Sequence, residues 1–350
     1  MSTLLKEITM KKIYQFSTLR TLVISAMILS ISNAYAEDAA TTPNEKPVTE
    51  QIVDTLTKLS GGPHKGYRAN HAKGIVVQGE FVPAKSAASI SKAIHLQSTP
   101  SPVIVRFSDA TGVPNIPDAD GNAFPKGIAI RFQLPDSTYT DIVSISTNGF
   151  PAATPEDFLG LLNAVAASGP DAAKPSPVEQ FLGAHPAALK FVQMPKPAPV
   201  SFATEAFYGV NAFIFTNAKG ETQYGRYRIT PVKGTEFLTK EETAKATPNY
   251  LFDELPARLS KAPAKYTIAV QLADKGDEVN DATVVWPETR KVVELGTLTI
   301  RSVDANGPQL EKSAMFNPLL LVDGIEASND PILQARPLAY AVSYGRRLAE

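Results

Sequence analysis

The chain has 350 residues, of which 43% are hydrophobic and 20% are charged, and its formal net charge is −1. A chain of this length can bury a full hydrophobic core, and a charge this close to zero gives no basic surplus for binding nucleic acid. Cysteine is absent, which excludes disulfides, thiolate metal ligands and a thiol nucleophile.

The first 36 residues have the pattern of a secretory signal peptide. A basic lead ends at Arg20, an apolar run covers residues 22–31, and residues 34–36 read Ala-Tyr-Ala, a small-x-small cleavage motif. The run is too short to cross a bilayer, so we expect cleavage after Ala36, export to the periplasm and no membrane span afterwards. The leader carries four basic residues and one acidic residue, so its removal lowers the net charge to about −4. Met10 offers a second start position before the basic pair at residues 11–12.

Residues 37–50 are polar and contain proline, which predicts a flexible leader ahead of one domain over residues 51–350. Apolar positions within residues 51–59 recur at helical spacing, and a Gly-Gly-Pro stop follows. Four strands are then predicted with no helical pattern between them, which favours an antiparallel sheet. They are the second half of residues 68–81 and residues 102–108, 127–134 and 141–146.

The second half of the domain mixes helices with strands. Helices are predicted over residues 155–165, 177–194 and 249–261, and strands over residues 208–216, 222–229, 266–273 and 293–302. Thr154 is the expected N-cap of the first of these helices, and Asn-Ala-Lys-Gly at residues 217–220 is a hairpin signal. The elements together predict a single α+β domain around a closed or nearly closed antiparallel sheet.

A C-terminal helix, expected to begin at Pro337, carries an unusual stripe of side chains. Arg336 and Tyr340 are four residues apart and share a face, and Arg347 lies two turns beyond Tyr340 near the same face. A free phenol has a pKa of about 10, and two nearby guanidinium charges favour its ionised form. The stripe therefore suits a tyrosinate metal ligand, although an ordinary amphipathic helix with a half-buried tyrosine has the same spacing.

The remaining candidates for chemistry are few. The four histidines, His64, His71, His95 and His185, are not spaced as a metal cage, and there is no Gly-x-Ser-x-Gly motif or phosphate-binding glycine loop. His71 precedes a predicted strand, a position where a histidine is more often structural than catalytic. Arg106 lies inside a predicted strand, and a buried arginine needs an anionic partner, either a protein carboxylate or a cofactor carboxylate.

Several blocks, in one order, resemble the haem catalases over residues 60–350. Arg68-x-x-His71-Ala-Lys-Gly resembles the segment with the distal histidine, and Arg336-x-x-x-Tyr340 resembles the segment with the tyrosine that ligates haem iron in catalase. The other matching blocks are residues 105–108, 126–132, 286–287, 294–296, 316–318, 323–325 and 330–331.

The resemblance implies an antiparallel eight-stranded β-barrel with helices packed outside, haem b as the cofactor and no NADPH site. The sequence ends ten residues after the tyrosine, so it is most similar to the small, exported catalase-related peroxidases. By this resemblance Tyr340 is the iron ligand, His71 is the distal acid–base group, and Ser108 orients its imidazole. Asn148 is the expected distal amide, across a gap in the match. The arginines expected at the cofactor are Arg68, Arg106 and Arg347 at the propionates and Arg336 at the tyrosine oxygen.

The implied activity is reduction of hydrogen peroxide or organic hydroperoxides with small organic donors, accompanied by weak catalase activity, in a monomer or small homo-oligomer. Two alternatives stay open. A non-catalytic periplasmic haem-binding protein would not need His71 with Ser108. A lipid-hydroperoxide-rearranging enzyme of the allene oxide synthase type would have threonine before the distal histidine, where this chain has Asn70.

Overall fold

The computed structural model describes residues 45–349, so the predicted signal peptide and most of the predicted leader lie outside the described residues. The elements below belong to one compact unit, residues 47–350. Eight strands form a closed antiparallel barrel, because β7 pairs with both β5 and β8 and so joins the two ends of the sheet. The barrel strands are β1 (Gly74–Pro83), β2 (Ser101–Ser108), β3 (Gly127–Gln133), β4 (Tyr139–Ile145), β5 (Phe207–Tyr208), β7 (Thr222–Pro231), β8 (Ala264–Leu272) and β9 (Val292–Val303). β6 (Phe213–Thr216) and β10 (Ile325–Ala327) extend the sheet beyond β7.

Side-chain alternation along β2 separates the barrel core from the outer face. Val103, Val105 and Phe107 belong to the main hydrophobic core, and the ring of Phe107 stacks on Phe202 with centroids 5.2 Å apart. Because successive strand residues point to opposite faces, Arg106 and Ser108 lie on the outer face, where both line a cavity. The period of two in this strand therefore places polar groups outside a filled apolar barrel.

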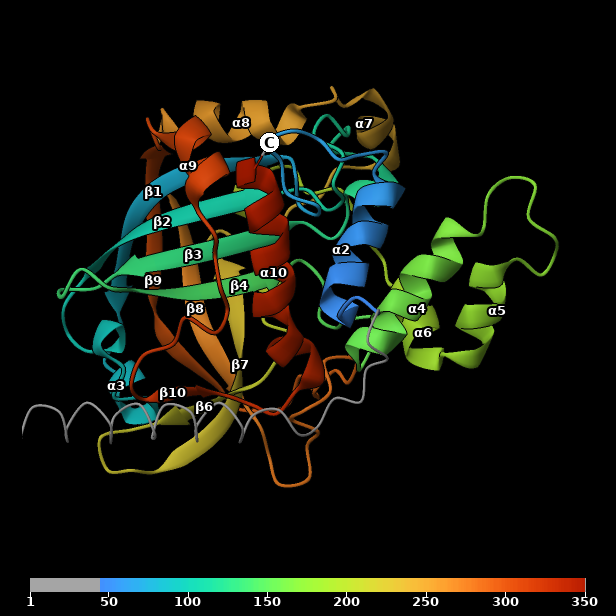
Figure 1. The fold of residues 1–350 in the computed structure, drawn as a ribbon. Coiled ribbons are helices and arrows are strands. Elements are labelled where there is room, and N and C mark those ends of the chain that lie inside the picture. The colour runs from blue at the N-terminus through green and yellow to red at the C-terminus, as the bar shows by residue number, and fades with distance from the viewer. Residues whose placement is uncertain (1–44, 350) are drawn as a thin grey trace, which may run out of the picture. The chain divides into compact units, whose positions relative to one another are not determined.

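Helices cover the outer face of the barrel (Figure 1). The C-terminal helix α10 (Pro331–Ala349) contacts α2 (Val48–Leu59), and α2 contacts α4 (Pro155–Ala166), so the three pack in a row. Thr154 caps α4, its Oγ1 accepting a hydrogen bond of 3.1 Å from the Asp157 N–H. The other helices are α3 (Ala87–Ile90), α5 (Pro177–Ala184), α6 (Pro186–Gln193), α7 (Lys240–Lys245), α8 (Tyr250–Leu259) and α9 (Gly307–Ser313). Among the described helices, none combines the length and the apolar character needed to cross a membrane.

The predicted α+β fold with an eight-stranded antiparallel barrel is confirmed. Several elements differ from their predicted bounds by one or two residues, and the larger differences are the following. α2 begins at Val48, inside the predicted leader. The helix expected over residues 177–194 breaks at Pro186, and the strand expected over residues 208–216 is divided between β5 and β6. α10 begins at Pro331, so Pro337, taken as the first helical residue, lies inside the helix.

Candidate functional site

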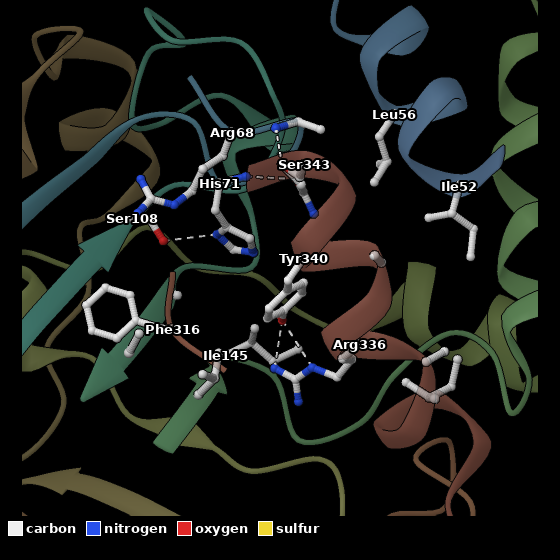
Figure 2. A pocket seen from close by; sticks show the side chains of 18 of the residues that line it. Ile52, Leu56, Arg68, His71, Ser108, Ile145, Phe316, Arg336, Tyr340 and Ser343 are labelled. Atoms are coloured by element: carbon white, nitrogen blue, oxygen red, sulfur yellow. Dashed lines mark hydrogen bonds between the residues drawn. The ribbon is translucent and has the colours of Figure 1, made fainter. Parts of the chain in front are cut away.

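A cavity of about 270 Å³ lies between the outer face of β2, β3 and β4 and the helices α2 and α10. The strand side has small residues, including Gly127 and Ala129, and the helix side contributes apolar residues such as Ile52 and Leu56. Figure 2 shows the polar residues of this cavity arriving from three elements: the loop before β1, the strand β2 and the helix α10. The site is therefore an apolar slot with a small number of placed polar groups.

His71 is held by its backbone and by its ring. Its φ is +54°, in the left-handed region, and its carbonyl oxygen accepts a 2.8 Å hydrogen bond from Arg106 Nη2. Its Nδ1 lies 3.0 Å from Ser108 Oγ, the pairing shown in Figure 2. A Cβ on Gly127 would lie 2.7 Å from Ser108 Oγ and 3.0 Å from the ring, so a side chain here would displace the hydroxyl or the imidazole. The second ring nitrogen, Nε2, stays available for chemistry.

The protonation of His71 is controlled by its surroundings. Burial lowers its pKa from 6.5 to about 3, and the charges of Arg106 and Arg68 act in the same direction. The imidazole is therefore neutral at neutral pH, as a proton acceptor must be. Burial has this effect because it disfavours the charged form of the imidazole.

Tyr340 receives two hydrogen bonds at its phenol oxygen, both from one guanidinium. Arg336 donates from Nε at 3.1 Å and from Nη2 at 2.9 Å, and Figure 2 shows both bonds. Two charge-assisted donors from one side chain thus fix the position of the phenol oxygen. The predicted shared face of Arg336 and Tyr340 is therefore present.

Asn211 holds Arg336 and is itself held by Asp330, and neither was predicted from the sequence as a site residue. Arg336 Nη1 donates to Asn211 Oδ1 at 2.8 Å, and Asn211 Nδ2 donates to Asp330 Oδ2 at 2.7 Å. Asp330 also accepts the Ile332 N–H at 2.9 Å with its other oxygen and so caps the helix that carries Tyr340. Aspartate followed by Pro331 was a visible signal for this helix start, whereas no local pattern pointed to Asn211.

Three arginines and one carboxylate form a cluster at one end of the cavity. Glu311, from α9, accepts from Arg68 Nη1 at 2.7 Å and from Arg106 Nε and Nη2 at 2.8 and 2.9 Å. Arg347 Nη2 donates to the Ala314 carbonyl oxygen at 2.9 Å. Arg106 thus has the protein carboxylate that one interpretation of the sequence required, and Glu311 was not identified from the sequence. Three guanidinium groups and one carboxylate leave two positive charges uncompensated within this cluster.

Asn148 is the predicted site residue that the structure does not bring to the cavity. β4 ends at Ile145, which lines the cavity, and the chain then turns so that Asn148 Nδ2 lies 3.3 Å from Glu288 Oε1. An amide beside His71 is instead supplied by Asn70, which lines the cavity and accepts the His71 N–H at 3.0 Å with Oδ1.

A buried network of charges anchors the segments that surround His71. Lys126 Nζ lies 2.5 Å from Asp109 Oδ1, and Lys73 Nζ pairs with Asp118 Oδ1. Lys73, Asp109 and Lys126 each lie within two residues of a cavity residue in the chain. All four side chains are buried, so breaking one pair would leave a buried charge unpaired.

The residues present fit a haem. Its two propionates would match the two uncompensated positive charges of the arginine cluster, where Arg347 Nε is buried and has no hydrogen-bond partner among residues 45–349. The phenol oxygen of Tyr340 would be the protein ligand to iron. The apolar walls, including Phe316 and Ile145 in Figure 2, suit a flat macrocycle.

Comparisons with known proteins agree with this fit. The family model described as catalase matches residues 65–350. A catalase-related peroxidase of Mycolicibacterium paratuberculosis is 33% identical over 84% of this chain and 93% of its own length, and one of Synechococcus elongatus is 32% identical over 93% and 95%.

Solved structures give the same fold. A fungal catalase superimposes with a TM-score of 0.73 and catalase A of Saccharomyces cerevisiae with 0.72, at 22% and 23% identity. The matches cover 89% and 85% of this chain but only 66% and 64% of those larger chains. The catalase-like barrel is thus shared, and with the family match over most of its length, the chain belongs to the catalase family.

Proposed function

We propose that this protein is a haem-dependent peroxidase that reduces hydrogen peroxide or organic hydroperoxides with small organic donors and has only weak catalase activity. The observation that carries the proposal is one cavity holding both a phenol with two guanidinium donors and a buried imidazole paired with a hydroxyl. Relatives about one-third identical over most of their length are named catalase-related peroxidases.

The residues that would hold haem b are Tyr340 at the iron, Arg336 at the tyrosine oxygen, and Arg68, Arg106 and Arg347 at the propionates. When bound, the haem supplies the redox chemistry, and the protein supplies binding, orientation and electrostatics. Arg336 holds the phenol oxygen in position through two hydrogen bonds.

His71 is the proposed acid–base group. Because Nδ1 is engaged with Ser108 Oγ, Nε2 is the atom that would accept a proton from the peroxide and return it to the leaving oxygen. The neutral imidazole set by burial is the form required for the first of these steps. A positioned acid–base group is worth roughly 10²–10⁴ in rate, so this residue should dominate the peroxide reaction.

The experiment compares the wild-type protein with His71→Ala after both are loaded with haem. We expect both to show the same Soret absorbance, since His71 makes none of the bonds assigned to holding the haem, and the variant to react with peroxide roughly 10²-fold slower or worse. Ser108→Ala is the matched variant, because it removes only the orienting hydroxyl, and its rate of reaction with peroxide should fall by less than that of His71→Ala. Equal peroxide turnover in wild type and His71→Ala would favour a haem carrier, and rearrangement of a lipid hydroperoxide without donor consumption would favour the allene oxide synthase type.

Export to the periplasm is part of the proposal, supported by the basic lead, apolar run and Ala-Tyr-Ala motif in residues 1–36. Fractionation of expressing cells with N-terminal sequencing of the mature protein tests it. A first residue of Glu37 in the periplasmic fraction is expected, and full-length cytoplasmic protein would contradict it.

A further inference from the structure

The turn before β1 contributes two consecutive residues, Asn70 and His71, to the lining of the cavity. In an extended chain, successive side chains point to opposite sides. The φ of His71 is +54°, so the chain leaves the extended conformation here and this alternation is broken. A residue other than glycine persists in this strained region only where its surroundings hold it. The strained turn therefore places an amide next to the imidazole at one cavity.

Hydrogen bonds from other elements hold this turn. The His71 N–H donates to Asn70 Oδ1 at 3.0 Å, and the His71 carbonyl oxygen accepts from Arg106 Nη2 at 2.8 Å. The Ala69 N–H donates to Ser343 Oγ at 3.1 Å. Because Arg106 lies on β2 and Ser343 on α10, the barrel and the C-terminal helix both fix the turn. The Asn70 side chain is thus held in place by the backbone of the residue it neighbours.

The orientation of the Asn70 amide follows from its partner. An N–H can only donate, so the amide atom that faces the His71 N–H is the oxygen, and Nδ2 is the other arm. Nδ2 makes no hydrogen bond to any group within residues 45–349. The other side-chain amide that lines the cavity belongs to Asn211, whose Nδ2 donates to Asp330 Oδ2 at 2.7 Å. Among the described cavity residues, Asn70 Nδ2 is therefore the amide donor left for a ligand.

The strand β4 supplies no such donor beside the imidazole. A Cβ at Gly127 would lie 3.0 Å from the His71 ring, and Gly127 pairs with Ile145 in the antiparallel register of β3 and β4. Paired residues point to the same face of a sheet, so the β4 side chain next to the imidazole is Ile145, which has no hydrogen-bonding group. Asn148, the amide expected near this strand, lies at Glu288 instead.

We propose that Asn70 is a catalytic residue, whose Nδ2 donates a hydrogen bond to the peroxide while His71 Nε2 takes the peroxide proton. This role rests on the proposed function. In the step, the peroxide O–H bond breaks, an N–H bond forms at Nε2, and the electron pair stays on oxygen as a hydroperoxide anion. Nothing is oxidised or reduced. A fixed donor aimed at a developing negative charge stabilises it. The O–O–H group is common to hydrogen peroxide and organic hydroperoxides, so both should depend on Asn70.

Fluoride, an anion that accepts hydrogen bonds and undergoes no turnover, tests the donor directly. It is titrated into the haem-loaded protein and followed by visible absorbance. Asn70→Ala should take up haem like wild type, since Asn70 makes none of the bonds assigned to the haem, and should bind fluoride about tenfold more weakly, the loss of one charge-assisted hydrogen bond. The charge-transfer band of the fluoride complex should also shift. The control is Asn163→Ala, an exposed asparagine on α4 outside the cavity lining, which should match wild type.

Asn70→Asp separates the two atoms of the amide, because aspartate keeps an oxygen for the His71 N–H and has no donor. Stopped-flow rates are compared for hydrogen peroxide and tert-butyl hydroperoxide, both uncharged. Asn70→Ala and Asn70→Asp should both react roughly tenfold slower than wild type with either peroxide. Wild-type rates in Asn70→Asp would show that Asn70 only holds the His71 backbone and would overturn the proposal. Haem uptake with unchanged fluoride affinity in Asn70→Ala overturns this inference alone, whereas a protein that takes up no haem overturns the proposed function as well.

Discussion

Replacing Glu311 by glutamine should destabilise the haem-free protein more than the haem-loaded protein. The carboxylate accepts three hydrogen bonds of 2.7 to 2.9 Å from Arg68 and Arg106. Burial raises the pKa of Glu311, but the charges of Arg106 and Arg68 outweigh burial and hold that pKa below its ordinary value. Glu311 is therefore ionised at neutral pH and is the only carboxylate paired with this cluster in the described residues. Glutamine keeps the shape and one acceptor oxygen but raises the net charge of the cluster from two to three.

The size of the effect follows from the burial of the partners. Removing one partner of a buried ion pair costs about 3–5 kcal/mol. Glu311 is 22% exposed, and glutamine retains a carbonyl acceptor, so we expect a loss of about 2–3 kcal/mol in the free energy of unfolding without haem. Two propionates bring two negative charges to the same cluster. Loading with haem should then recover part of this loss, which by linkage means tighter haem binding by the variant.

The assay is urea unfolding followed by far-ultraviolet circular dichroism, with and without haem, together with a haem titration at the Soret band. The control is Glu80→Gln, since Glu80 pairs with Arg301 at 3.2 Å on the surface and should change the unfolding free energy by less than about 1 kcal/mol in both states. An identical loss for Glu311→Gln with and without haem would refute the charge argument. No loss in either state would refute the assigned role of Glu311.

Three further predictions concern single groups of the fold and the site. Arg336→Met should weaken haem affinity about 10–100-fold, because it removes both donors from the tyrosine oxygen; unchanged affinity in a Soret titration would contradict this. Glu205→Gln should remove a pH dependence of folding: burial raises the pKa of Glu205 to about 8, so its contribution to stability is complete below the unfolded pKa near 4.5 and is lost as pH rises through 8. At about pH 9, the free energy of unfolding of the variant, measured with urea, should therefore exceed that of wild type by on the order of a few kcal/mol. A wild type that is the more stable of the two at this pH would disprove the assignment. For His71, whose pKa burial lowers to about 3, the rate of reaction with peroxide should show no inflection near pH 6.5, and stopped-flow measurements across the neutral range would reveal one if the imidazole titrated there.

The individual strands of the barrel could be predicted because the residue pattern that specifies each strand is local. In β2 the alternation that buries Phe107 also exposes Arg106 and Ser108 to the cavity, and that pattern is visible in eight residues. Closure of the sheet depends on β7 pairing with β8, which no local pattern reports. The succession of elements predicted a closed or nearly closed sheet, and the eight-stranded barrel was implied by the resemblance to the catalases.

The misplaced helix start and the position of Asn148 also have local causes. Pro337 was taken as the start of the last helix, although Asp330 and Pro331 offered the same N-terminal signal earlier. Asn148 was assigned as the distal amide from its residue type alone, across a gap in the match to the catalases. In the structure β4 ends at Ile145, and Asn148 points toward Glu288. Beyond the end of a strand, side chains no longer alternate between two faces, so the sequence does not predict where the Asn148 side chain points.

Glu311 shows why part of the site could not be predicted. It lies 205 residues from Arg106 in the chain and on a seven-residue helix, so no spacing rule connects the two. A buried arginine requires an anion, but this requirement does not say where along the chain the anion comes from. The sequence predicted the arginines and left their charge balance unknown.

That charge balance links the arginine cluster to His71. The arginines that would hold the propionates stand close enough to His71 to lower its pKa in addition to burial, and Arg106 also binds the His71 carbonyl oxygen. The same side chain therefore positions the imidazole and disfavours its protonated form. Two carboxylates entering the cluster would cancel its excess charge and remove part of that second effect while burial remains. The acid–base group would then be adjusted by the arrival of the cofactor it serves, because one set of guanidinium groups contacts both.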